Sequence, residues 1–291
     1  MSVLAPRTAL PKLTDRLPLG ASGLAVSPFC AGLTVDPATV LAAYEAGINF
    51  FFVTADMHWP VYEPLRQGLR LLLRAKPGAR DDIVVAVASY VTQPEFCMAP
   101  FLEVLEELPE LRRIDLLVAG GSYGHEIDMR AAIYEVHRTD RLAGCRAIGA
   151  TFHDRAAARR LLDAGTLDIV HVRYNPSHPR AATEVFPHVQ SRDAGRRTLL
   201  YNFKSTVGWL VTEDEYAAIG VQPGYWRPHA TDYYRFALTQ PALDGVLCGL
   251  PTPESVGELA DALAKGPLDD EDHQYLIDLA DLQKGAAKLI A

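Results

Sequence analysis

Eight alternations of a short apolar run with an amphipathic stretch constrain the fold of this chain more than any other feature. The apolar runs end near Leu33, Thr54, Ala88, Ala119, Ala150, Arg173, Asn202 and Gly249. Runs such as residues 83–88 contain almost no polar side chain, which is typical of parallel strands covered on both faces. Parallel strands need crossover connections, and the stretches between these runs are long enough to be helices.

Helical spacing is clearest at residues 62–74, where Leu65, Leu69 and Leu72 form one stripe. Asp36 and Pro37 are typical of a helix start. Comparable patterns occupy residues 101–108, 129–138, 156–162, 181–189 and 255–264. We therefore predict an α/β fold, a (β/α)₈ TIM barrel, formed by residues 1–291 as one domain with an N-terminal tail of about residues 1–14. A doubly wound open sheet is the alternative, but no G-x-G-x-x-G follows the first strand.

Composition narrows the class of protein. The formal charge of −8 and the short basic pairs, such as Arg112-Arg113, argue against a nucleic-acid surface. The four cysteines have no paired spacing, so neither a disulfide framework nor a zinc ribbon is predicted. The scattered histidines form no H-x-H or H-E-x-x-H motif, and we predict no metal site. Without a signal peptide or a transmembrane run, we expect a soluble cytoplasmic protein.

Residues 49–59, with the sequence NFFFVTADMHW, give the chain its most informative motif. They resemble the second-strand motif of the aldo-keto reductases, approximately N-F-F-D-T-A-x-x-Y. Residues 17–28 are similar to that family's R-x-L-G-x-x-G-L-x-V-S-P opening, and residues 146–151 and 246–256 resemble its fifth and eighth strands. The resemblance implies a barrel of the aldo-keto reductase type with an N-terminal β-hairpin.

The same resemblance implies hydride transfer from NADPH by a tetrad of aspartate, tyrosine, lysine and histidine. Here Val53 stands at the aspartate position and His58 at the tyrosine position. The lysine position falls at Ala88 or Ser89, and the histidine position at Ala119 or Gly120. All four positions are altered, so we expect a divergent active site.

The positions that hold NADPH in the family also differ. Thr151-Phe152 replaces the serine and asparagine that bind the carboxamide, and His171 replaces a glutamine. Gly249-Leu250 and Glu254-Ser255 replace the basic residues that bind the 2′-phosphate. Glu254 would repel a phosphate at that helix start. We therefore predict no cofactor, with NADP as the alternative.

His58 is the strongest candidate for a catalytic group. It follows the second strand, where barrel active sites lie, and a histidine can act as an acid or a base near neutral pH without a lysine partner. It could equally be a loop histidine that packs beside Trp59. Asp56 could orient it or only cap the turn, and Tyr90 offers a second proton donor after the third strand.

Candidate substrate-binding residues follow other strand ends. The prediction includes Trp59, Phe152, Tyr174, Asn175, His178 and Lys204. Asn175 precedes a proline, so turn formation is its simpler role. Lys204 lies in a loop that follows the cofactor pyrophosphate in the family, where it could bind a phosphate or carboxylate, although most loop lysines are only solvated.

These features lead to one main hypothesis and two alternatives. The main one is an aldo-keto-reductase-like enzyme of specialised metabolism that uses acid–base chemistry without hydride transfer, such as elimination, cyclisation or isomerisation, on a small molecule or peptide. The first alternative is an NADPH-dependent carbonyl reductase with a rearranged site. The second is a non-catalytic barrel that serves as a binding or scaffold subunit, which a mouth filled by Trp59, Phe152 or Trp209 would favour.

Overall fold

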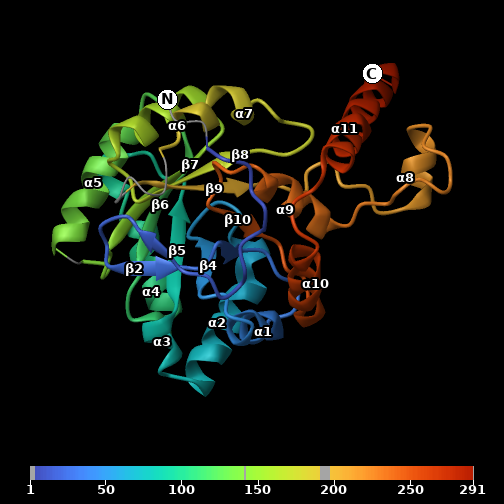
Figure 1. Ribbon diagram of the computed structural model, residues 1–291. Helices are drawn as coiled ribbons and strands as arrows, with labels where there is room; N and C mark the ends of the chain where they lie inside the picture. The colour runs from blue at the N-terminus through green and yellow to red at the C-terminus, as the bar shows by residue number, and fades with distance from the viewer. Residues whose placement is uncertain (1–3, 141, 191–196, 291) are drawn as a thin grey trace.

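Eight parallel strands close into a barrel that helices surround (Figure 1). The computed structural model describes residues 4–140, 142–190 and 197–290. In barrel order the strands are β10 (Gly245–Cys248), β3 (Phe29–Ala31), β4 (Phe50–Thr54), β5 (Val84–Ser89), β6 (Leu116–Ser122), β7 (Ala147–Phe152), β8 (Ile169–Arg173) and β9 (Leu199–Phe203). A two-stranded antiparallel hairpin, β1 (Leu17–Leu19) and β2 (Leu24–Val26), precedes them. The predicted barrel with an N-terminal hairpin is confirmed.

Helices follow the strands in the described part of the chain. They are α1 (Ala38–Glu45), α2 (Glu63–Ala75), α3 (Ala79–Asp82), α4 (Ala99–Glu107), α5 (Ile127–Asp140), α6 (Arg155–Ala164), α7 (Ala181–Glu184), α8 (Glu213–Ala218), α9 (Ala230–Thr239), α10 (Pro253–Ala264) and α11 (Asp270–Ile290). Short 3₁₀ turns also occur: η1 (Trp59–Tyr62), η2 (Pro94–Phe96), η3 (Pro109–Leu111) and η4 (Phe186–His188). Within these ranges, no helix combines the length and the apolar character needed to cross a bilayer.

The hairpin lies at the end of the barrel where the strands begin. Asn49, just before β4, accepts a hydrogen bond from the Ser27 amide (2.7 Å) and donates one to the Ala25 carbonyl (2.9 Å). Tyr201 of β9 donates to the Ser27 carbonyl (2.7 Å). These contacts close the N-terminal end of the barrel, so a ligand must enter from the opposite end.

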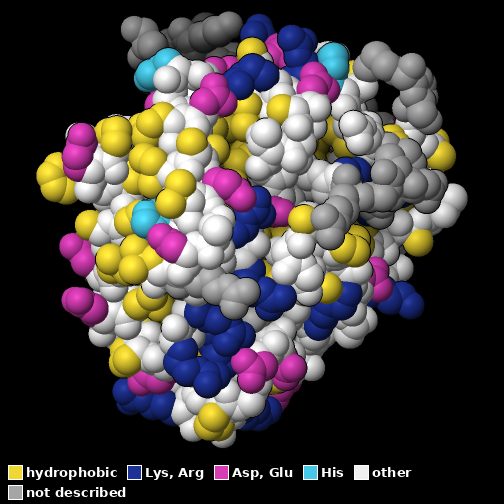
Figure 2. Space-filling view, turned by 90° about the vertical axis from the view of Figure 1, so that its left-hand side faces the viewer, with side chains coloured by type: hydrophobic (Ala, Val, Ile, Leu, Met, Phe, Trp, Pro, Cys, Tyr) yellow, Lys and Arg dark blue, Asp and Glu magenta, His cyan; other side chains and the backbone are white. Residues whose placement is uncertain are grey.

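Figure 2 shows one face of the molecule, where Lys and Arg side chains gather with Asp and Glu side chains among them. Arginines that are adjacent in the sequence form ion pairs with carboxylates. Arg113 Nη2 lies 3.2 Å from Asp81 Oδ1. Arg160 Nη1 lies 2.9 Å from Asp128 Oδ1, and Arg197 pairs with Asp244. Of the third basic pair, Arg196 lies outside the described residues. In each of the three Arg-Arg sequences, at least one arginine therefore forms an ion pair with a carboxylate.

Large side chains fill the barrel interior in layers. Phe50 contacts Tyr201 edge to face, with ring centroids 5.7 Å apart. One layer higher, His171 contacts Phe52 (5.9 Å) and lies 5.8 Å from Tyr201. His171 is fully buried, and neither of its ring nitrogens has a hydrogen-bond partner among the described residues. Burial lowers the pKa of His171 to about 4, so the imidazole is neutral in the folded protein at neutral pH.

This buried imidazole predicts a pH-dependent stability. An unfolded histidine titrates near 6.5, whereas the folded pKa of His171 is about 4. Between these values only the unfolded chain binds the proton, so the free energy of unfolding should fall as the pH falls, by about 3 kcal/mol at pH 4. Urea unfolding from pH 7 to pH 4 measures this change. His171→Leu should remove most of this pH dependence. His137→Gln, on the exterior helix α5, should leave it unchanged. Equal pH slopes for His171→Leu and the wild type would contradict the assignment.

Candidate active site

A cavity of about 1180 Å³ opens at the C-terminal ends of the barrel strands. Its lining includes Phe52 of β4, Thr151 of β7 and Phe203 of β9, together with residues from the loops that follow β4, β5, β6 and β10. Binding sites for single small molecules usually measure about 300–1,000 Å³. This cavity is therefore large enough for two ligands, such as a cofactor and a substrate.

His58 and Tyr90 lie side by side in this cavity. Their rings meet edge to face with centroids 5.7 Å apart. His58 has a left-handed backbone, with φ 67°, at the start of η1. The Tyr90 ring lies against Gly120 and Gly121, and a Cβ on Gly120 would come within 2.9 Å of Tyr90 Cε2. The glycine pair therefore makes room for Tyr90, and Tyr90 supports the imidazole.

Asp56 ties the ends of β4 and β5 together. Its carboxylate accepts hydrogen bonds from Ser89 Oγ (2.7 Å), the Tyr90 amide (2.9 Å) and the Met57 amide (2.5 Å). Among the described residues, His58 donates no hydrogen bond to it. Of the two roles considered for Asp56, the contacts match capping of the turn.

Two fully buried arginines hold the loops of this mouth, and sequence reasoning missed both. Arg66 of α2 donates to the Thr54 carbonyl (2.6 Å) and the Trp59 carbonyl (3.1 Å), and its guanidinium stacks on the Trp59 ring. Arg130 of α5 donates to the Ser89 carbonyl (2.5 Å) and the Gly120 carbonyl (3.1 Å). Burial lowers the pKa of Arg66 to about 10, which still leaves it charged near neutral pH. Nothing in a helical sequence pattern reveals that an arginine points inward at a strand end.

Four tyrosines line the cavity with His58, and Tyr62 and Tyr90 are two of them. Tyr62 of η1, also missed at the sequence level, packs against Phe52 with ring centroids 6.1 Å apart. Burial, reinforced by Tyr90, raises the pKa of Tyr62. Burial, reinforced by the Asp56 carboxylate, raises the pKa of Tyr90. Both phenols therefore hold their protons more tightly than free tyrosine does, which favours the imidazole as the group that exchanges a proton.

The predicted substrate-binding residues are divided between the cavity and the interior. Lys204 lines the cavity, with a left-handed backbone at φ 58°. Trp59, Phe152, Tyr174, Asn175 and His178 do not line it. Tyr174 packs between Phe186 and Phe236, with ring centroids 5.0 and 5.2 Å away.

Asn175 and His178 support the loop that carries Lys204. Asn175 Nδ2 donates to the Lys204 carbonyl (2.7 Å), and its Oδ1 lies 3.0 Å from His178 Nδ1. The side chain of Asn175 is fully buried, so it acts here on the backbone of the loop. The cavity therefore unites His58, Tyr90 and Lys204 of the predicted set.

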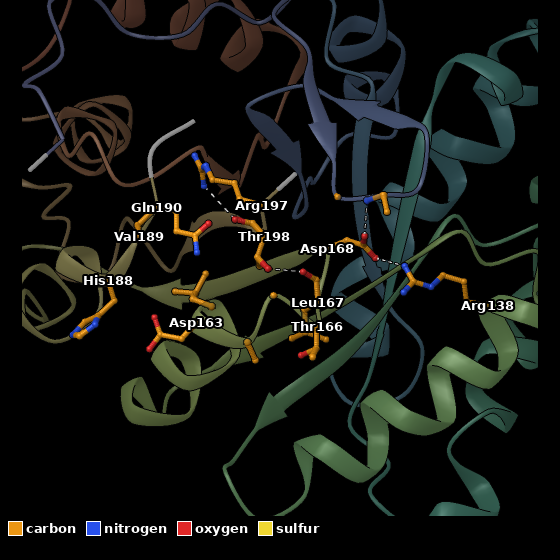
Figure 3. A pocket seen from close by; sticks show the side chains of 15 residues that line it. Arg138, Asp163, Thr166, Leu167, Asp168, His188, Val189, Gln190, Arg197 and Thr198 are labelled. Carbon is orange, nitrogen blue, oxygen red and sulfur yellow. Dashed lines mark hydrogen bonds and ion pairs between the residues drawn. The ribbon is translucent and has the colours of Figure 1, made fainter. Parts of the chain in front are cut away.

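A second cavity of about 410 Å³ lies at the opposite end of the barrel (Figure 3). Three of the charged residues that line it, Arg138, Asp168 and Arg197, are already paired. Arg138 Nη1 lies 2.8 Å from Asp168 Oδ2, and Asp168 also accepts from the Ala21 amide (3.2 Å). Arg197 pairs with Asp244. This arrangement joins the hairpin to the barrel and matches the structural role usual for this end of the fold.

Cys248 is the cysteine that lines the cavity, and it is buried like the other three. All four cysteines are buried and free, as expected of small apolar side chains. In residues 4–140, 142–190 and 197–290, no three His, Cys, Asp or Glu side chains are grouped so that they could hold a metal ion.

We compared the chain with known proteins by sequence and by structure. No protein-family model matches the sequence, and no curated protein matches it. Solved structures do match. The aldo-keto reductase AKR11C1 from Bacillus halodurans, in its holo form, is 17% identical with a TM-score of 0.68, and the match covers 91% of this chain and 96% of that one. The glycerol dehydrogenase AKR11B4 from Gluconobacter oxydans is 15% identical with a TM-score of 0.64, covering 91% and 95%.

This chain has the aldo-keto reductase fold. The aldo/keto reductase from Brucella melitensis matches over 91% of this chain and 99% of its own, at 13% identity and a TM-score of 0.61. The resemblance first seen in four short motifs therefore extends over the barrel.

The comparison also corrects one prediction. We expected a site without a cofactor because the positions that hold NADPH are altered. AKR11C1 from Bacillus halodurans, however, is a structural match in both a holo form and an apo form. An aldo-keto reductase barrel of the same architecture thus takes up a cofactor, and the prediction of none is wrong. Chemistry without hydride transfer, which followed from it, gains no support from these matches.

Proposed function

We propose that this chain is a nicotinamide-dependent oxidoreductase that interconverts small carbonyl compounds and alcohols, with His58 as the proton-transfer group. The observation that carries the proposal is the cavity at the strand ends, which holds His58, Tyr90 and Lys204 and exceeds the size of a single-ligand site. The oxidoreductase names of the matched structures support the same reaction class.

Several features of the cavity suit a nicotinamide dinucleotide. Thr151 Oγ1 accepts a hydrogen bond from the Gly121 amide (2.8 Å), and its own O–H has no acceptor within the described ranges. That hydroxyl can donate to a carboxamide. The cavity continues to Gly249 after β10, where a side-chain Cβ would meet nothing nearer than 3.8 Å. Open space therefore runs from the reactive groups to the end of β10.

The reaction needs a hydride and a proton. When bound, a reduced nicotinamide would supply the hydride for the carbonyl carbon. Protonated His58 donates its proton to the carbonyl oxygen as negative charge develops there, and the neutral imidazole accepts the proton back in alcohol oxidation. Tyr90 holds the imidazole by its ring contact, and Arg66 and Arg130 hold the two loops that carry these residues.

Three aromatic residues that could have filled the mouth lie elsewhere, which argues against a purely structural barrel. Trp59 stacks on Arg66, and the side chain of Phe152 is buried. Trp209 donates to the Pro228 carbonyl (3.0 Å). None of the three lines the cavity. The mouth therefore stays open to a ligand.

Nucleotide binding tests the proposal. The protein's tryptophan fluorescence is followed during titration with NADPH and, separately, with NADH. We expect saturable binding of at least one of them, with a dissociation constant of roughly 1 µM to 1 mM, followed by its oxidation when benzaldehyde is added. Titration with AMP controls for binding of the adenosine half alone. No binding of either reduced nucleotide at millimolar concentration would contradict the proposed function.

A further inference from the structure

Three neighbouring strands bring a set of cationic side chains to one side of the cavity. In the barrel register Phe152 pairs with Val172, and Arg173 pairs with Phe203. His153, Arg173 and Phe203 therefore stand at the same level on neighbouring strands. The rings of His153 and Phe203 both line the cavity, and their centroids are 5.2 Å apart.

The direction of Arg173 follows from its own strand. His171 points into the barrel, because it contacts Phe52 and Tyr201 there. Side chains alternate along a strand, so Arg173, two residues later, projects from the same inner face at the mouth. Arg173 does not itself line the cavity but lies next to His153 and Phe203, which do. Lys204 follows Phe203 and also lines the cavity.

These two cations lack carboxylate partners. Within the described ranges, neither Arg173 nor Lys204 takes part in an ion pair, and the Arg173 guanidinium donates no hydrogen bond. The carboxylates of Asp154 and Glu184 have other partners. Asp154 Oδ1 caps α6 through the Ala156 amide (3.0 Å), and Glu184 pairs with Arg155.

The pKa of the neighbouring His153 reflects the presence of these cations. Burial lowers the pKa of His153, and Lys204, Arg173 and His178 lower it further. Burial and then Arg155 lower the pKa of Arg173. The carboxylate that lines the cavity, Glu126, comes from the loop after β6 and lies 3.3 Å from Arg130 Nη1. A half-buried guanidinium without an acceptor is costly, and an anionic ligand would supply the missing acceptor.

We propose that Arg173 and Lys204 form an anion subsite that binds a carboxylate or phosphate group on the carbonyl substrate. This inference rests on the proposed function, because it names the substrate class of the same cavity. The forked guanidinium of Arg173 matches the two oxygens of an oxyanion, and the flexible ammonium of Lys204 adds a point charge. Asn175 fixes the loop that presents Lys204.

A matched pair of substrates tests the subsite. Initial rates are measured with 4-formylbenzoate and with benzaldehyde, which lacks the carboxylate. Hydrogen bonds to charged groups contribute about 1.5–3 kcal/mol, so we expect kcat/KM to favour 4-formylbenzoate by roughly 10- to 150-fold. Arg173→Gln and Lys204→Asn should each remove most of that preference, and asparagine also tolerates the left-handed backbone at position 204. Arg160→Gln, on the outer helix α6, is the control and should keep it.

The Michaelis constant for the nucleotide shows whether the two cations bind the substrate or the cofactor. We expect this constant to change less than about twofold in Arg173→Gln and Lys204→Asn. The loss of one hydrogen bond to a charged group would change it by roughly tenfold or more. If these variants instead weaken nucleotide binding and leave the preference for 4-formylbenzoate intact, the cations serve the cofactor phosphates and the inference is overturned.

Calorimetry tests the subsite without turnover. Benzoate, phenyl phosphate and benzyl alcohol are titrated into the protein in the absence of nucleotide. Binding of benzoate or phenyl phosphate at least about tenfold tighter than benzyl alcohol, lost in Arg173→Gln, supports the subsite, and the tighter anion identifies the preferred group. This result would stand even if no nucleotide were oxidised, in which case only the proposed function fails. Equal binding of all three compounds would overturn the subsite.

Discussion

Replacing His58 by asparagine should lower kcat/KM for aldehyde reduction by about 10²- to 10⁴-fold, the usual contribution of a positioned general acid. Asparagine is chosen because position 58 has a φ of 67° and asparagine tolerates the left-handed region. The variant should therefore fold normally but lack a group that can transfer the proton. Steady-state kinetics with the preferred nucleotide measure the effect.

Tyr90→Phe is the informative partner of this variant. It keeps the ring that packs on Gly120 and contacts His58, and it removes only the hydroxyl. If His58 is the donor, Tyr90→Phe should retain activity within a few-fold, because a supporting aromatic contact is worth only about 0.5–1.5 kcal/mol and phenylalanine preserves it. His137→Asn, on the exterior helix α5, should be unaffected. A large loss in Tyr90→Phe with little loss in His58→Asn would assign the proton to the phenol instead.

Replacing Asp115 by alanine should lower the free energy of unfolding by about 3–5 kcal/mol. Asp115 lies immediately before β6 and is fully buried. Its Oδ2 lies 2.9 Å from Arg80 Nη2 and also accepts from the Val85 amide (2.9 Å). The variant leaves the buried Arg80 charge without its carboxylate partner and the Val85 amide without its acceptor. The free energy of unfolding of a whole domain is only about 5–15 kcal/mol.

Urea unfolding measures this loss as a lower transition midpoint. The matched control is Asp81→Ala, which removes a carboxylate that pairs with Arg113 but is 72% exposed. Exposed pairs contribute about 0–1 kcal/mol, so the control should remain close to the wild type. Similar midpoints for Asp115→Ala and Asp81→Ala would show that the buried pair does not contribute as we describe.

The strands could be read from the sequence because burial on both faces leaves continuous apolar runs. The predicted ends at Thr54 and Arg173 agree with β4 and β8, and the other predicted ends lie close to those of the corresponding strands. The helix expected at residues 181–189 is divided into α7 and η4. Pro187 explains the interruption, because its ring nitrogen cannot donate the hydrogen bond that a continuing helix needs.

The site was only partly predictable. His58, Tyr90 and Lys204 follow strand ends directly, and a barrel brings the residues after its strands to one mouth. Tyr174 and Asn175 also follow a strand, but their side chains are buried away from the cavity. The inward direction of Arg66 and Arg130 and the cavity position of Tyr62 depend on packing between distant segments. A local pattern contains no information on such contacts.

The altered tetrad remains a prediction from the sequence, and it defines the chemical problem. A phenol whose pKa is raised by burial is a poorer proton donor at neutral pH, and this describes both Tyr62 and Tyr90. A histidine at position 58 offers a different proton donor at the position of the family's tyrosine. The reaction proposed above thus uses hydride transfer with a different residue to handle the proton.

Deuterium transfer tests this account most directly. The protein is incubated with 4-formylbenzoate and with NADH or NADPH that carries deuterium on one face of C4, each face being labelled in turn. We predict that the alcohol product carries one deuterium at its new C–H bond, from one labelled face only, and that His58→Asn forms this product much more slowly. A protein that binds neither nucleotide, or that leaves the deuterium on both labelled faces untouched, would contradict hydride transfer in this barrel.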